Sequence, residues 1–173
     1  MISGVSALFT RLLVPTAVRR ELAAKSHRNA AALQALEENV IFDACDDYDA
    51  VSLEVLLQER AFRGEGKDQG EAEAVAQAAK RSTQMVLVDD ALGRSWAEMM
   101  KRECHGTLWI FEQLRILEYL SSLRPLFEQL LQNGRRQPLL SMNEILRRYH
   151  ESEITDDEFR SLTSTVAGPR ISS

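Results

Sequence analysis

The sequence predicts an α/β fold with a mainly parallel sheet, helices on its faces and a helical C-terminal part. Short apolar runs at residues 12–14, 39–42 and 85–88 indicate strands, and apolar residues recur at helical spacing between them. The run at 85–88 is continuously apolar, which is typical of a parallel strand that is covered on both sides. From residue 108 onward the spacing is helical, so the sheet belongs to the first two thirds of the chain.

The elements of the first part follow from local signals. Residues 5–13 predict a short helix and then a strand, which Pro15 ends because proline cannot donate to a sheet. We then expect a helix over 16–26, a helix over 28–38, the strand 39–42, an acidic loop over 43–49, a helix over 53–60, a glycine-rich loop over 64–70 and a small-residue helix before the strand 85–88.

The second part is helical. A helix is expected over 91–102, and the helical region 108–132 breaks at Pro125 and ends at Gly134. Ser141 with Glu144, and Thr155 with Glu158, have the spacing of capping boxes that open two further helices. Residues 167–173 are expected to form a frayed tail.

Composition limits the class of protein. The chain has 173 residues, 45% of them apolar, and a formal net charge of -5, which argues against coating nucleic acid through bulk charge. Cys45 and Cys104 lie far apart without metal-ligand spacing, which suits a reducing cytoplasm. No apolar run reaches the roughly 18 residues of a membrane helix, so no membrane partner is expected.

Acidic residues flank the predicted strand 85–88. Glu71, at the start of the preceding helix, shares a face with the apolar residues three, four, seven and eight positions on, so we expect it to face inward. Glu73 shares a mixed face with Gln77 and Lys80 and is expected to be more solvated. The alternative for Glu71 is that it only stabilises the positive N-terminal end of its helix.

Two more acids, Asp89 and Asp90, come directly after the strand, and Glu21 lies on an inward face between Val18 and Leu22. Inward carboxylates near strand-end carboxylates are how proteins hold a hard divalent cation. The alternative for Asp90 is that it caps the helix that follows.

Four motifs in order resemble one known family. They are the run from Leu12 to Leu22, the run Gly70-Glu71-Ala72-Glu73-Ala74-Val75, the run Val86-Leu87-Val88-Asp89-Asp90 with Arg94, and His105-Gly106-Thr107-Leu108. The chain thereby resembles the PIN-domain superfamily, and more narrowly its VapC-like branch, grouped as domain of unknown function 3368. The resemblance runs from about residue 5 to residue 149 and implies a PIN-like domain over 1–150, followed by a C-terminal helix and tail over 151–173.

The resemblance implies a metal-dependent endoribonuclease, often the toxin of a toxin–antitoxin pair, with Mg²⁺ or Mn²⁺ held by acids. Glu21, Glu71 and Asp90 match the family's catalytic acids, and the same three with Asp89 match its metal ligands. Asp89 is also a close alternative to Asp90 at the strand end. Arginines that could meet RNA phosphates are Arg19, Arg20 and Arg94, with a solvated helix face as the alternative.

The departure from the family concerns its first strand, which ends in a central metal-binding Asp. The present chain has no Asp before Asp43. The expectation is therefore weak or absent metal binding by this chain alone, and doubtful activity. The alternative function is a non-catalytic protein-interaction module with a degenerate PIN-like fold.

A sheet that lacks this strand would expose backbone groups, so a homo-oligomer or an antitoxin-like protein partner is expected, with contacts near residues 1–14. Those apolar residues could instead pack on the helices of residues 108–131 within a monomer.

Overall fold

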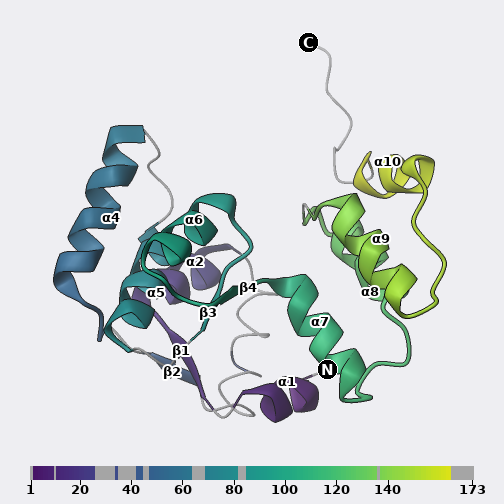
Figure 1. The fold of residues 1–173 in the computed structure, drawn as a ribbon, viewed down its shortest axis with the longest axis horizontal. Helices are drawn as coiled ribbons and strands as arrows, with labels where there is room; N and C mark the ends of the chain where they lie inside the picture. Colours follow the sequence, from purple (N-terminus) through teal and green to yellow (C-terminus); the bar gives the residue numbers. More distant parts are fainter. Residues whose placement is uncertain are drawn as a thin grey trace. The chain divides into compact units, whose positions relative to one another are not determined.

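The computed structural model of the chain describes residues 2–9, 11–25, 34, 42–44, 47–63, 69–81, 85–135 and 137–164. It divides into two compact units, Met1–Ile110 and Phe111–Ser173, and each is described by itself. The first unit is mixed α/β, and the second is helical (Figure 1). This arrangement confirms the predicted fold class. The predicted domain boundary after residue 150 stays a prediction.

The first unit contains two short parallel strand pairs. Strand β1 (Leu12–Val14) pairs with β2 (Phe42–Ala44), and Leu12 lies opposite Phe42. Strand β3 (Val86–Leu87) pairs with β4 (Cys104–His105). The helices described in this unit are α1 (Ile2–Leu8), α2 (Thr16–Lys25), α4 (Ala50–Arg63), α5 (Gln69–Lys80), α6 (Ala91–Met99) and the start of α7 (Thr107–Ile116).

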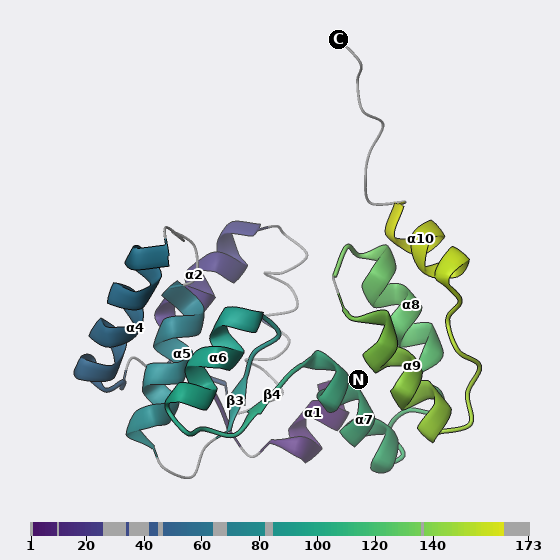
Figure 2. The ribbon, with the colours of Figure 1, turned by 45° about the horizontal axis from the view of Figure 1, so that its top comes forward.

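Helix α5 forms the centre of the first unit, and it contacts α2, α4, α6 and β3. Figures 1 and 2 both show α4 on one side of α5 and α6 on the other. Alanines over most of its length let these neighbours approach closely, and Ala72, Val75 and Ala76 are fully buried. Their core partners are Leu56 of α4, Val86 and Val88 around β3, and Trp96 and Ala97 of α6.

Most predicted elements of the first unit are confirmed. The helix expected over 16–26 is α2, and the strand 85–88 contains β3. The helix expected over 53–60 is longer, because Asp49 accepts a hydrogen bond from the Ser52 N–H and α4 begins at Ala50. Of the helix expected over 28–38, only residue 34 is described, and it is helical. Residues 39–41 of the strand 39–42, most of the loop 64–70 and the tail lie outside the described residues.

The second unit is built on α8 (Arg124–Gln132), α9 (Leu139–Arg148) and α10 (Asp156–Ser164). Asn143 of α9 is buried, and its side-chain amide binds the backbone of Ile154, before α10. The amide donates to the Ile154 carbonyl at 2.9 Å and accepts from the Ile154 N–H at 2.8 Å. The apolar core of this unit consists of Leu114, Leu123, Phe127, Leu131, Met142, Ile145, Leu146 and Ile154.

One predicted capping box is confirmed and the other is wrong. Thr155 and Glu158 exchange hydrogen bonds, with 2.8 Å from the Thr155 N–H to the Glu158 carboxylate. Ser141 does not open its helix, because α9 already begins at Leu139 after Pro138. The extended backbone of Pro138 provides the N-cap conformation, which places Ser141 inside the first turn.

Glu151 caps α8 from a distance in the sequence. Its carboxylate accepts hydrogen bonds from the Ser122 hydroxyl at 2.7 Å and from the backbone N–H groups of Leu123 and Arg124 at 2.9 Å. Burial alone would raise the pKa of Glu151, but these hydrogen bonds outweigh burial and hold the pKa below its ordinary value. The charged form is therefore the form that stabilises the fold.

We predict that Glu151→Gln lowers the free energy of unfolding by about 1 kcal/mol at neutral pH, since a charged cap is lost. Because the folded pKa is depressed, this contribution is fully present above the ordinary pKa and disappears as the pH falls through the folded value. Urea denaturation of both proteins from neutral to acidic pH measures the difference. Glu144→Gln, an exposed change on α9, is the control, and a difference that persists in acid contradicts the assignment.

Candidate functional site

The predicted acidic residues lie around the N-terminal ends of three helices of the first unit. Glu71 is in the first turn of α5, Asp90 directly precedes α6, and Asp89 contacts the first residue of α7, Thr107. Glu21 approaches the same end of α5 from α2. A helix N-terminus carries partial positive charge, which favours carboxylates there and also attracts anions.

Glu21 lies against the start of α5. A Cβ added at the buried Gly70 would lie 3.2 Å from Oε1 of Glu21 and 2.9 Å from Cγ2 of Val18. The close approach of α2 to α5 therefore requires a glycine at this position. It brings the Glu21 carboxylate next to the residue that precedes Glu71.

Glu71 is half-buried, and its stem packs toward α6. A Cβ added at Gly93 would lie 3.4 Å from Cβ of Glu71 and 2.8 Å from Cγ1 of Val88. Gly93 thus lets the first turn of α6 approach both the end of the β3 segment and the start of α5. This contact places Glu71 beside the helix that Asp90 caps.

Asp90 caps α6, so the alternative given for this residue is confirmed. Its Oδ1 accepts hydrogen bonds from the Leu92 N–H at 2.7 Å and the Gly93 N–H at 3.4 Å, and its backbone is extended. Its side chain is exposed. A role for Asp90 as a metal ligand stays a prediction.

Asp89 is held by the start of α7. It accepts hydrogen bonds from the Thr107 N–H at 2.8 Å and from the Thr107 hydroxyl. A Cβ added at Gly106 would overlap both the Asp89 carboxylate and the Arg94 guanidinium, so these two groups lie over the glycine. Arg94 is exposed, and its guanidinium shares the space over Gly106 with the Asp89 carboxylate.

The prediction for Glu73 is wrong. Its side chain is only 5% exposed, and its carboxylate accepts hydrogen bonds from the Ala17 N–H at 3.1 Å and from the Gln69 amide at 2.8 Å. Glu73 therefore ties the start of α2 to α5, whereas Glu71 is the more accessible of the two acids. The error arose because α5 is covered on several sides, so a mixed face does not mark solvent.

Sequence reasoning also missed the three glycines and Thr107 as parts of the site. Gly70, Gly93 and Gly106 each stand where a helix end and an acid meet closely. The available signal was a glycine within a few residues of each acid, which indicates a close approach of backbone rather than a loop.

Two of the arginines proposed from the sequence lie on α2, where Arg19 is half-buried and Arg20 is exposed.

Cys104 of β4 lies near this cluster. Burial raises the pKa of its thiol, Arg94 lowers it, and Asp89 raises it, with a net increase. The thiol therefore stays protonated at neutral pH and is not an activated nucleophile. The neighbouring His105 is stacked on Trp109, with ring centroids 4.1 Å apart, and its ring nitrogen contacts Glu103 at 2.7 Å.

The resemblance implies Mg²⁺ or Mn²⁺, and the described side chains do not form a complete site for either ion. Among the described residues, no group of three or more His, Cys, Asp or Glu side chains is placed to hold a metal ion. Asp89 and Asp90 both accept hydrogen bonds from the protein itself. The described donors therefore do not fit a complete metal cage, and we derive no chemical step through a metal.

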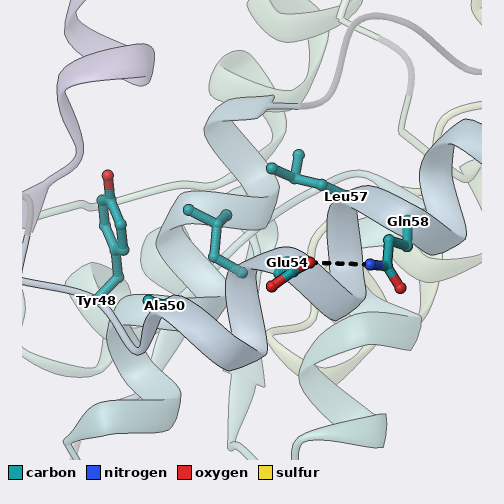
Figure 3. A pocket seen from close by; sticks show the side chains of 6 residues that line it. Tyr48, Ala50, Glu54, Leu57 and Gln58 are labelled. Atoms are coloured by element: carbon teal, nitrogen blue, oxygen red, sulfur yellow. Dashed lines mark hydrogen bonds between the residues drawn. The ribbon is translucent and has the colours of Figure 1, made fainter.

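Two hollows are found in the first unit away from these acids. One, of about 380 Å³, lies beside α4 between Tyr48 and Leu57, and Figure 3 shows Glu54 of its wall bonded to Gln58. This hollow is mostly apolar and has no cluster of reactive groups. The other, of about 480 Å³, lies along β1, α5 and β3. In the part of the chain that the structure describes, no helix is long and apolar enough to cross a membrane.

Comparison with known protein families gives a match over most of the chain. The family model for domain of unknown function 3368, described as a PIN domain, matches residues 2–151. No curated protein and no solved structure matches the chain. The matched region contains all the acids described above, and it covers most of the chain. The chain therefore belongs to the PIN-domain family, a superfamily of nucleases.

Proposed function

We propose that the chain is an endoribonuclease-family toxin of the PIN type, acting on RNA at the acidic helix ends of its first unit. The observation that carries this proposal is the gathering of Glu21, Glu71, Asp89 and Asp90 around the starts of α5, α6 and α7. The family assignment supports the nuclease class. In this proposal Glu21, Glu71 and Asp90 are the catalytic acids.

RNA binding is proposed to involve Arg94 first. Its guanidinium lies over Gly106 at the start of α7 and is exposed, so it is the group proposed to meet a phosphate. The Asp89 carboxylate lies over the same glycine. Arg19 and Arg20 on α2 remain further candidates for phosphate contacts.

Mg²⁺ or Mn²⁺ is the cofactor that the family implies, and we propose that this chain alone binds it weakly at best. Two of the acids, Asp89 and Asp90, already accept hydrogen bonds that a metal would compete with. A six-coordinate cation held here mainly by Glu21 and Glu71 would keep most of its water ligands, and so few protein ligands give low affinity. The cellular setting proposed for the protein is the cytoplasm.

The alternative is a non-catalytic interaction module. A specific observation favours it as a second candidate, namely that Asp89 and Asp90 both serve local structure, as a bridge to Thr107 and as a helix cap. A homo-oligomer or an antitoxin-like partner is compatible with either function. The two functions differ in whether Mn²⁺ supports RNA cleavage.

The affinity for Mn²⁺ tests the proposed site. Calorimetric titration of the full chain with Mn²⁺ is expected to give a dissociation constant of about 0.1 mM or weaker, because few carboxylates are available. Glu21→Gln and Glu71→Gln should weaken it further, while Glu98→Gln, an exposed change on α6, should not. Tight stoichiometric Mn²⁺ binding whose affinity is the same in Glu21→Gln and Glu71→Gln would contradict the proposed site.

Cleavage of a labelled single-stranded RNA at saturating Mn²⁺ separates the two functions. Cleavage that is lost in Glu71→Gln supports the nuclease. If RNA stays intact while Mn²⁺ is bound, the interaction module is the correct function. Glu98→Gln is again the matched control, since it removes one exposed carboxylate from the same unit.

The salt dependence of RNA binding tests the proposed role of Arg94. Arg94→Ala should lower the affinity for a single-stranded RNA and reduce the slope of affinity against salt by about one unit, as expected for one lost phosphate contact. Gly106→Ala should act similarly, because its methyl group displaces Arg94 and Asp89. Fluorescence anisotropy at several salt concentrations measures both.

Arg135→Ala, an exposed change in the second unit, is the control for this experiment. Equal losses in Arg94→Ala and Arg135→Ala would show that binding follows total charge rather than the proposed site.

A further inference from the structure

Glu73 of α5 is buried next to the candidate site. Its side chain is only 5% exposed, and each of its carboxylate oxygens accepts a hydrogen bond from the protein. Oε2 accepts from the Ala17 N–H at 3.1 Å, and Oε1 accepts from the Gln69 amide at 2.8 Å. Because it is buried, this carboxylate can act on the site only through the groups that it binds.

The apolar contact between α2 and α5 is small. The two helices lie side by side in both views (Figures 1 and 2). Among the described side chains of α2, only that of Ala17 is buried, and Val18 and Leu22 are half-buried. Apolar contacts are not directional, so small side chains alone fix one helix along another weakly. A hydrogen bond has a defined length and direction, so the bond from Ala17 to Glu73 fixes α2 along α5.

This hydrogen bond lies one helical turn from Glu21. Four residues after Ala17 on α2, the Glu21 carboxylate lies against Gly70, where a Cβ would be 3.2 Å from its Oε1. Gly70 in turn lies three residues before Glu73 on α5. Residues three or four apart share a helix face and are about one turn, 5.4 Å, apart, so the two contacts are successive points along one line. A shift of α2 at Glu73 would therefore move the Glu21 carboxylate as well.

We propose that Glu73 is a positioning residue for the candidate site, which holds Glu21 beside Glu71 by fixing α2 along α5. Glu71 directly follows Gly70, so the contact at Gly70 sets how the two acids lie relative to each other. The inference rests on the proposed function for what Glu21 and Glu71 do, but the position of Glu21 can be measured without metal or RNA.

The alternative is that Glu73 only stabilises the start of α2, as a carboxylate does at the positive end of a helix. Asp49 provides a matched case. It accepts the Ser52 N–H at 2.7 Å at the start of α4, which also packs on α5. Helix α4 contains none of the candidate acids. Asp49→Ala therefore removes a helix cap from the same unit without changing α2.

Labelling of carboxylates with a carbodiimide and glycine ethyl ester, followed by mass spectrometry, measures the accessibility of Glu21 in the full chain. Glu73→Leu removes both acceptors at roughly the same volume, so labelling of Glu21 should rise at least about threefold. Glu73→Gln keeps an oxygen for the Ala17 N–H, and the Gln69 amide can turn to accept from the new amide. This conservative variant should keep the labelling within about 1.5-fold of the unmodified chain.

The controls separate a local shift from general loosening. Glu59 of α4 is half-buried in the same unit, and its labelling should change less than about 1.5-fold in Glu73→Leu. Asp49→Ala should leave the labelling of Glu21 unchanged. A rise at Glu21 that is absent in Glu73→Leu, that Glu59 shares equally, or that Asp49→Ala reproduces overturns the proposal. If circular dichroism shows that Glu73→Leu does not fold, Ala17→Pro replaces it, since proline has no N–H and is tolerated in the first helical turn.

Cleavage of single-stranded RNA at saturating Mn²⁺ shows what the position of Glu21 does for the site. Glu73→Leu should lower kcat at least about tenfold and change KM less than about twofold, because a misplaced group slows the reaction without removing substrate contacts. In a Glu21→Gln background, Glu73→Leu should lower kcat by less than about twofold further, as expected for residues that act through one another. Additive losses would show that Glu73 acts independently of Glu21 and overturn the proposal.

The two measurements distinguish this inference from the proposed function. If the chain cleaves no RNA, but labelling of Glu21 rises in Glu73→Leu and not in Glu73→Gln, the inference is supported and the proposed nuclease is contradicted. If the chain cleaves RNA and labelling of Glu21 is the same in all these variants, the proposed function stands and the positioning role of Glu73 is overturned.

Discussion

The burial of α5 on several sides is the constraint on which the first unit depends. A helix can contact α2, α4, α6 and β3 together only if its side chains are small, and α5 meets this need with alanines and a buried glycine. Its few polar residues then acquire special roles. Glu73 ties α2 to α5, Glu71 stays accessible at the helix start, and Gln77 is buried without a partner among the described residues.

This constraint also explains how far the sequence could predict the structure. Apolar periodicity and caps located the strand at 85–88 and the helix of residues 16–26, because each is specified locally. The same reasoning wrongly placed Glu73 on a solvated face, since a single helix does not show how many neighbours cover it. Contacts such as those at Gly106 form between segments far apart in sequence, and only a fold brings them together.

Helix α2 borders both the candidate site and the hollow along β1, α5 and β3. Val18 of α2 lines this hollow. The same side chain lies against Gly70, and Gly70 lies beside Glu21 of the candidate site. At the site, Asp89 and Asp90 support helix starts as well as offering carboxylates. Carboxylates that accept hydrogen bonds in this way are held rigidly, and a metal ion would have to compete with those hydrogen bonds. This balance makes metal affinity the property that distinguishes an active enzyme from an interaction module.

Hydrogen exchange of the full chain, followed by mass spectrometry, tests most directly whether α5 organises the first unit. Amides within residues 72–78 should be the slowest of this unit and should exchange only when the whole unit unfolds, whereas those of α4, with its exposed Val51 and Val55, should exchange sooner through local opening. If α5 exchanges as fast as α4, α5 is not the centre of the unit. The positions of the acids and of the hollow beside α5 would then need another explanation.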